Sequence, residues 1–257
     1  MSKAFANLIS KSDLIAVATP DVPIALVQSA MLEDSPDYID VPLSEAVILK
    51  GADAAPIPIV KIYPKKTGYA PTPEALMEHT GRPSLLFLTM VNEGPFDVYL
   101  TNSRDALQDA SIMRVEAVKS EVRRQAVLSA ASSPDKSLPH FKEVRDLLAE
   151  LPQASPKRQE KIFQKLEALG EEGVPAMVTQ MDDRRPLAVP RITLVNKNLN
   201  AFEGLRHYGP ELVVDALDAI LNQITGFGGF VHNGGAERKR QATVAAWRVY
   251  VADIRCH

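Results

Sequence analysis

The sequence predicts an α+β protein, with a small antiparallel β-barrel in residues 1–110 and an all-α domain of paired helices in residues 111–257. Two observations support this prediction. Before Asn102 the apolar residues form short alternating or continuous runs, and after it they recur at helical spacing. The first half also lacks the regular alternation of strands and helices that a parallel, doubly wound sheet requires.

Five or six strands are expected in the first half. Short apolar runs of strand length occupy residues 12–19, 41–50, 57–63, 85–91 and 96–101, and the run at 24–31 could form a further, second strand. The run at 85–91 is continuous, which indicates a strand buried on both faces. The segment 92–95, Asn-Glu-Gly-Pro, predicts a hairpin turn, and a short helix could lie at 73–79. Irregular connections of this kind suit a small closed barrel.

Four helices are expected between residues 111 and 183. The first, at 111–131, carries an apolar stripe made of Ile112, Val115, Val118, Val122 and Ala126. The second has an apolar face made of Phe141, Val144, Leu147 and Leu148 and is expected to stop at Pro152. The stretch 155–183 then predicts two short antiparallel helices, with Ser155 as the N-cap and Gly170 as the left-handed residue after the first. A turn of four to five residues is expected before Pro175 restarts the second, a pattern typical of helical repeats.

Two more helices are expected near the C-terminus. Residues 184–200 are ambiguous, since their prolines exclude a regular helix while residues 192–195 could be extended. Residues 211–225 show the strongest helical pattern, with Leu217 in the middle of a wide apolar face. A glycine-rich loop at 227–235 separates it from a last helix at 236–254, which carries Trp247 on its apolar stripe.

Composition excludes several functional classes. The chain has a net charge of −3, and residues 1–110 alone carry 8 Lys+Arg against 14 Asp+Glu, so we expect no nucleic-acid partner. The one cysteine, Cys256, allows neither an intramolecular disulfide nor a thiolate zinc cluster. Apolar runs long enough for a membrane span are absent from the sequence. The N-terminal residues do not resemble a signal peptide, which predicts a cytoplasmic protein, or an extracytoplasmic one whose signal has been removed.

Catalytic motifs are also absent from the sequence. It contains no phosphate-binding loop, zinc-protease motif or nucleophile elbow, and none of the five histidines lies within four residues of another. We therefore expect no cofactor and no metal site. The candidates for binding are His207, His232, Asn233 and Arg184.

Each candidate also has an ordinary structural interpretation. His207 and His232 flank the strong helix on its two sides, so a site built from both would require distant segments to converge. The loop at 226–235, which contains Asn233, could bind an anion, or it could be a plain connection between helices. Arg184 follows two aspartates, which is typical of a solvated turn that neutralises itself.

Several short motifs resemble known families. Residues 170–183, with Gly170, two acids and Val174-Pro175-Ala176, resemble HEAT-like repeats. Residues 221–226 with Trp247-Arg248 resemble the end of HEAT-like domains in uncharacterised bacterial envelope proteins. In the first half, residues 12–15, 49–51, and Gly81 followed by 85–88 resemble the netrin or TIMP-like OB barrel. Inhibition by TIMP proteins depends on an N-terminal cysteine, which residues 1–255 lack, so the resemblance does not imply protease inhibition.

The resulting expectation is a non-catalytic binding or scaffolding protein of the bacterial envelope, whose partner is a protein or peptide. The alternative is a hydrolase with a site assembled around His207 and His232. Convergence of two histidines and a carboxylate in a cleft would distinguish the alternative from the main expectation.

Overall fold

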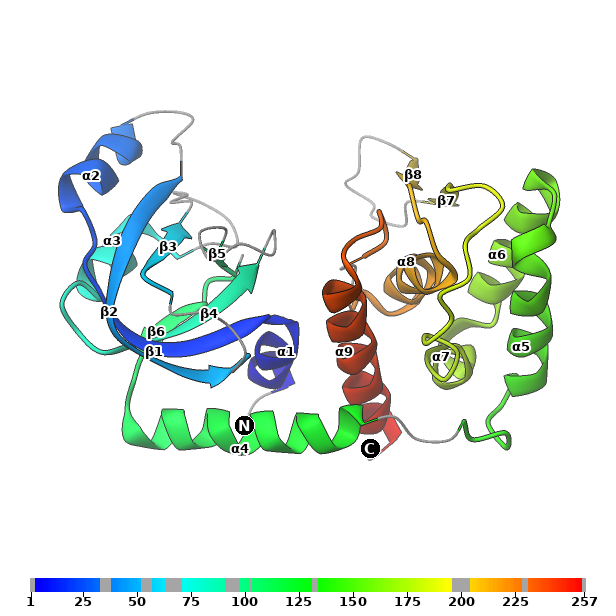
Figure 1. Ribbon diagram of the computed structural model, residues 1–257, viewed down its shortest axis with the longest axis horizontal. Helices are drawn as coiled ribbons and strands as arrows, with labels where there is room; N and C mark the ends of the chain where they lie inside the picture. The colour runs from blue at the N-terminus through cyan, green and yellow to red at the C-terminus, as the bar shows by residue number, and fades with distance from the viewer. Residues whose placement is uncertain are drawn as a thin grey trace. The chain divides into compact units, whose positions relative to one another are not determined.

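The computed structural model describes residues 3–32, 38–51, 57–62, 71–90, 98–101, 103–130, 134–195, 204–227 and 231–255 (Figure 1). The chain divides into two compact units, Met1–Gln125 and Ala126–His257. This division falls inside helix α4 (Ile112–Ser129), whereas the sequence places it before that helix, at residue 110. Each unit is described separately.

The first unit is built on a closed five-stranded β-barrel. Its strands are β1 (Leu14–Pro20), β2 (Ile39–Lys50), β3 (Ile59–Ile62), β4 (Ser84–Met90) and β5 (Val98–Leu100). They follow the order β1-β2-β3-β5-β4, and pairing of β1 with β4 closes the barrel. Neighbouring strands are antiparallel except β3 and β5, which run parallel. This closed barrel, with helix α3 (Pro73–Glu78) between β3 and β4, fits the OB-like expectation.

The continuous apolar run at the start of β4 is buried on both faces, which confirms its prediction. Leu86 and Leu88 lie in the barrel interior, while Leu85 and Phe87 pack outside it against helix α1 (Lys3–Lys11) and α4. The sequence analysis missed strand β6 (Leu107–Asp109). It pairs with the first residues of β4, whereas β5 pairs with the last residues of that strand. The predicted turn at 92–95 lies outside the described residues.

Two predictions for the first unit are wrong. The run at 24–31 forms helix α2 (Ile24–Leu32) rather than a strand, because Pro23 accepts hydrogen bonds from the amides of Leu26 and Val27 and so starts a helical turn. A short apolar run cannot be assigned to strand or helix by periodicity alone. In α4 the predicted apolar stripe is not buried at its start, where Ile112 is 84% exposed. The buried face of the helix includes the polar residues Glu121 and Gln125, which the prediction did not contain.

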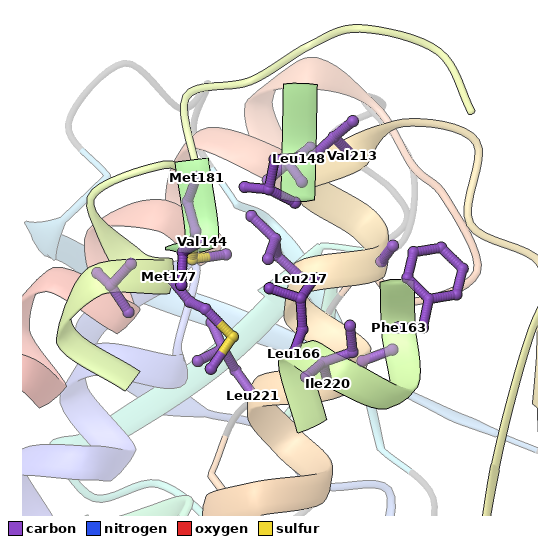
Figure 2. Close-up of a cluster of buried hydrophobic side chains, with 14 of the residues drawn as sticks. Val144, Leu148, Phe163, Leu166, Met177, Met181, Val213, Leu217, Ile220 and Leu221 are labelled. Carbon is purple, nitrogen blue, oxygen red and sulfur yellow. The ribbon is translucent and has the colours of Figure 1, made fainter. Parts of the chain in front are cut away.

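The second unit contains five α-helices in its described residues. They are α5 (Phe141–Glu150), α6 (Pro156–Ala168), α7 (Gly170–Val178), α8 (Val213–Thr225) and α9 (Glu237–Arg255), and a 3₁₀ turn at Leu151–Gln153 follows α5. Helix α7 packs against α5, α8 and α9, and α6 packs against α8 and α5. Figure 2 shows Val144 of α5, Leu166 of α6, Met177 of α7 and Leu217 of α8 in one cluster of buried side chains.

The helix pair predicted at 155–183 is present, although its connection differs. Ser155 is the N-cap, because its side chain accepts a hydrogen bond from the amide of Arg158, and Gly170 has a left-handed φ of 59°. However, α7 begins at Gly170 itself, so Pro175 lies inside the helix instead of restarting it. The left-handed glycine changes the direction of the chain at once, so the predicted turn of four to five residues is not present.

The prediction that the second unit is all-α is also wrong. Two strands, β7 (Ile192–Val195) and β8 (Leu205–Tyr208), follow α7 in the chain and precede α8, and they pair as an antiparallel ribbon. Ile192 and Leu194 face the helical core, while Thr193 and Val195 lie on the other face. The extended segment at 192–195 agrees with the sequence analysis, whereas its partner strand was missed.

Candidate functional site

The structure does not bring the two predicted histidines together. His207 lies on β8, where its Nδ1 is 3.0 Å from the hydroxyl of Thr193 on β7. His232 follows α8, and its ring packs against Tyr208 with 4.4 Å between the ring centroids. Consecutive residues of a strand point to opposite faces. His207 and Tyr208 therefore face opposite sides of the ribbon, and His232 lies on the side of Tyr208.

Asn233 and Arg184 both hold parts of the chain together. The side-chain oxygen of Asn233 accepts a hydrogen bond of 2.9 Å from the amide of Gly209. Arg184 forms an ion pair of 3.0 Å with Glu237 at the start of α9, and donates a hydrogen bond to the carbonyl of Met181. Arg184 is therefore not part of a self-neutralising turn with the two aspartates that precede it, because its partner comes from a distant segment.

The sequence analysis missed a cluster of buried charges on α8. Asp215 is fully buried, and Arg240 of α9 donates two hydrogen bonds to its carboxylate, of 2.8 Å and 2.9 Å. The same carboxylate accepts hydrogen bonds from the amides of Glu211 and Leu212, just before α8 begins. The hydrogen bonds with Asp215 raise the pKa of Arg240 above its usual range, so the guanidinium stays protonated.

Asp218 lies one turn further along α8 and is also fully buried. Its carboxylate accepts hydrogen bonds from the indole N–H of Trp247, at 2.8 Å, and from the amide of Val231, at 2.9 Å. The Nδ1 of His232 is 3.9 Å from the same carboxylate. Asp218 therefore links α8, α9 and the loop between them.

The position of these acids in the sequence is a signal that could have revealed them. Residues three apart lie on one face of a helix. Asp215 and Asp218 are three apart and lie between apolar residues of the strongest helical pattern, where a charge is buried only with a partner. Because their partners are amides, an indole and a guanidinium from the same unit, they act as internal ties. Among the described residues, no group of three His, Cys, Asp or Glu side chains gathers in a metal-binding arrangement.

A second candidate lies on the outer surface of the barrel. Tyr38 is 56% exposed, and its ring packs edge-on against Tyr99 of β5, with 4.8 Å between the centroids. The Nζ of Lys61 lies 6.0 Å from the centroid of the Tyr99 ring. Lys61 is in register with Asp40 on one side and with Tyr99 on the other. We call the four residues Tyr38, Asp40, Lys61 and Tyr99 the tyrosine face.

The composition of the tyrosine face suits binding rather than catalysis. Tyrosine rings offer a large, rigid contact area with a polar end, and they are enriched where proteins meet. The acid and the amine beside them can form hydrogen bonds with a partner. The four side chains contain no imidazole, thiol or paired carboxylates of the kind that proton transfer and nucleophilic attack use.

No protein-family model, curated protein or solved structure matches this chain. Of the helices that the structure describes, none is both long enough and apolar enough to cross a membrane. The function is therefore argued from the geometry of the two candidate sites.

Proposed function

We propose that this chain is a non-catalytic binding protein, whose barrel binds a protein or peptide through the tyrosine face. The observation that carries the proposal is the exposure of Tyr38, 56% of whose surface remains in contact with solvent while the ring packs against Tyr99. A partner that covers this ring would bury apolar area at a small entropic cost, since the ring is already held in place.

The helical unit supports the proposal by what its charged groups do. Asp215, Asp218 and Arg240 are used in hydrogen bonds within the unit, which leaves them unsuited to bind and turn over a substrate. The packing of α5 to α9 around one core is in keeping with the HEAT-like expectation, and HEAT-like repeats commonly present extended binding surfaces. The bacterial envelope setting, which follows from the resemblance of the end of the chain, is part of this proposal.

The charge of the barrel half favours a protein or peptide over nucleic acid. Residues 1–110 carry 14 Asp+Glu and 8 Lys+Arg, and an acidic surface repels a phosphate backbone. Aromatic rings beside an amine and a carboxylate match the mixed apolar and polar surface of a protein partner. The hydrolase alternative is not supported in the same way, because His207 and His232 contact Thr193 and Tyr208 on opposite faces of the ribbon.

Site-specific photo-crosslinking in the cells that produce this protein tests the proposal. A photoreactive phenylalanine analogue at position 38 should yield a discrete adduct with one protein. Val47, which is 58% exposed on β2, provides a matched control position on the same barrel. Adducts of equal yield at both positions, or none at position 38, would contradict the proposal. The Tyr99→Ala variant should reduce the adduct at position 38, because the residue at that position loses the ring against which Tyr38 packs.

A further inference from the structure

His232 is held in an unusual environment for a histidine. Its Nδ1 is buried and has no hydrogen-bond partner among the described atoms, although the carboxylate of Asp218 is 3.9 Å away. A buried polar atom without a partner costs free energy, because it has given up its hydrogen bond to water. The ring itself is only partly covered, with 24% of the side chain exposed, so water can reach its other edge.

The segment around His232 is held by the burial of Val231, which is 1% exposed, and by contacts of polar groups. The amide of Val231 donates a hydrogen bond to Asp218, and Asn233 accepts one from the amide of Gly209. Between them, the His232 ring lies against Tyr208 of β8. These three contacts join residues 231–233 to α8 and to the ribbon, and the histidine is the member of the set that can change its charge near neutral pH.

We propose that His232 is an acid-sensitive latch, which holds residues 231–235 against α8 and β8 when its ring is neutral and releases them when the ring is protonated. A neutral imidazole packs well against a tyrosine ring in a partly apolar environment. An imidazolium needs water or an acceptor at both nitrogens, and in the observed position its Nδ1 is too far from Asp218 for a hydrogen bond. The charged ring is therefore expected to leave this position.

The charged groups around His232 act in opposite directions. Burial lowers the pKa of His232 below its ordinary value of 6.5, Asp218 of α8 opposes this shift, and Lys239 of α9 adds to it. Tyr208 faces the ring from β8. Glu211 lies beside Gly234, where it is paired with Arg240. Burial is the largest of these effects, so the folded protein prefers the neutral ring.

The direction of the pH effect follows from this preference. Because the pKa is lower in the folded state, the unfolded state binds more protons between that lower value and pH 6.5. The free energy of unfolding of the second unit should therefore fall as the pH falls through this window. Local opening of residues 231–235 responds in the same direction, since it also returns the ring to water.

The fluorescence of Trp247 provides a specific reporter of the latch. It is the one tryptophan of the chain, and its indole donates a hydrogen bond to Asp218, the residue that also holds Val231. In a titration from pH 7.5 to pH 5, wild-type protein should show a reversible change in Trp247 emission with a midpoint below 6.5. The His232→Gln variant should lose this change. The His207→Gln variant, altered at an exposed histidine of the same unit, should keep it.

An NMR titration of the wild-type protein makes the test independent of the variants. The ring signal of His232 should titrate below pH 6.5. The protection of the Val231 amide against hydrogen exchange should decrease in the same pH range. The protection of the Ile220 amide, in the middle of α8, should stay unchanged. The latch would be disproved if His232 titrated at or above its ordinary pKa, if the Trp247 change persisted in His232→Gln, or if Val231 kept its protection.

Discussion

The two units satisfy their buried polar groups in different ways. The barrel closes on itself through the pairing of β1 with β4, and the charged side chains that bond its main-chain groups are only partly buried, as where Asp13 accepts a hydrogen bond from the amide of Met90. The helical unit has long connections on both sides of α8, and it fixes them with Asp215, Asp218 and Arg240, all of them buried. In the described part of the first unit, the buried charged residue is Glu121 of α4, which lies outside the barrel.

This difference shows where function can be sought. In the helical unit the most distinctive polar residues are needed for the fold, so substituting them would reduce stability before it revealed a function. In the barrel unit, the fold does not depend on the polar residues of the outer surface. The tyrosine face can therefore be altered with little risk to the core.

The largest effect is expected for Asp215→Ala. This change leaves Arg240 buried without its main acceptor and removes the acceptor of two amides at the start of α8. Breaking a buried pair in this way costs about 3–5 kcal/mol. Glu211→Ala is the control, because it also removes a partner of Arg240 but alters a side chain that is 64% exposed. We expect about 1 kcal/mol or less for this variant, measured by chemical denaturation. Equal losses of free energy of unfolding in the two variants would contradict the claim that burial makes Asp215 more important for stability than Glu211.

The next effect tests whether the two units are separate folding units. Leu217→Ala in α8 and Leu86→Ala in β4 each remove a fully buried side chain and should each cost about 2–5 kcal/mol. If the units unfold independently, calorimetry should show Leu86→Ala lowering one transition and Leu217→Ala lowering the other. A single transition lowered by both changes would show that the units unfold together. Val127→Ala, at a site 76% exposed, should change the free energy of unfolding by less than about 0.5 kcal/mol.

A smaller effect is expected at the helix N-termini. The Ser155→Ala variant removes the cap of α6, in which the hydroxyl accepts a hydrogen bond from the amide of Arg158, and should cost about 1 kcal/mol. Ser111 makes a contact of nearly the same length with the amide of Arg114, 3.4 Å against 3.3 Å at Ser155, but the start of α4 is exposed, so less packing is lost when it frays. We expect Ser111→Ala to cost less. Thermal denaturation of both variants measures the difference, and a larger loss for Ser111→Ala would contradict this ranking.

The last effect concerns alkaline pH and the barrel unit. Burial lowers the pKa of Lys50 to about 8 from 10.5, against the attraction of Asp13, and its Nζ donates hydrogen bonds to the carbonyls of Ile9 and Ser12. Because the unfolded state holds the proton up to a higher pH, the free energy of unfolding should rise as the pH rises from about 8 to 10.5. Lys50→Met should flatten this rise in denaturation curves measured at several pH values. If the free energy of unfolding of Lys50→Met rose with pH as steeply as that of the wild type, groups other than Lys50 would cause the rise.

Much of the fold could be predicted from local patterns. The strand at β4, the capped start of α6, the left-handed Gly170 and the apolar face of α8 each depend on a few neighbouring residues, and the structure has each of them. The errors occur where tertiary contacts decide. The apolar run of α2 suits a helix or a strand equally well, and β6 and β8 are three and four residues long, which is too short to show a period.

The candidate sites show the same division between sequence and tertiary structure. The sequence by itself determined the change from strands to helices near residue 110 and the absence of catalytic motifs, because both depend on spacing along the chain. Only the tertiary structure decided that His207 and His232 lie on opposite sides of the ribbon, that Asp215 and Asp218 are buried with distant partners, and that Tyr38 meets Tyr99. The separation in sequence is 24 residues for Tyr208 and His232, 25 for Asp215 and Arg240, 29 for Asp218 and Trp247, and 61 for Tyr38 and Tyr99. A spacing pattern carries no information about which distant residues meet.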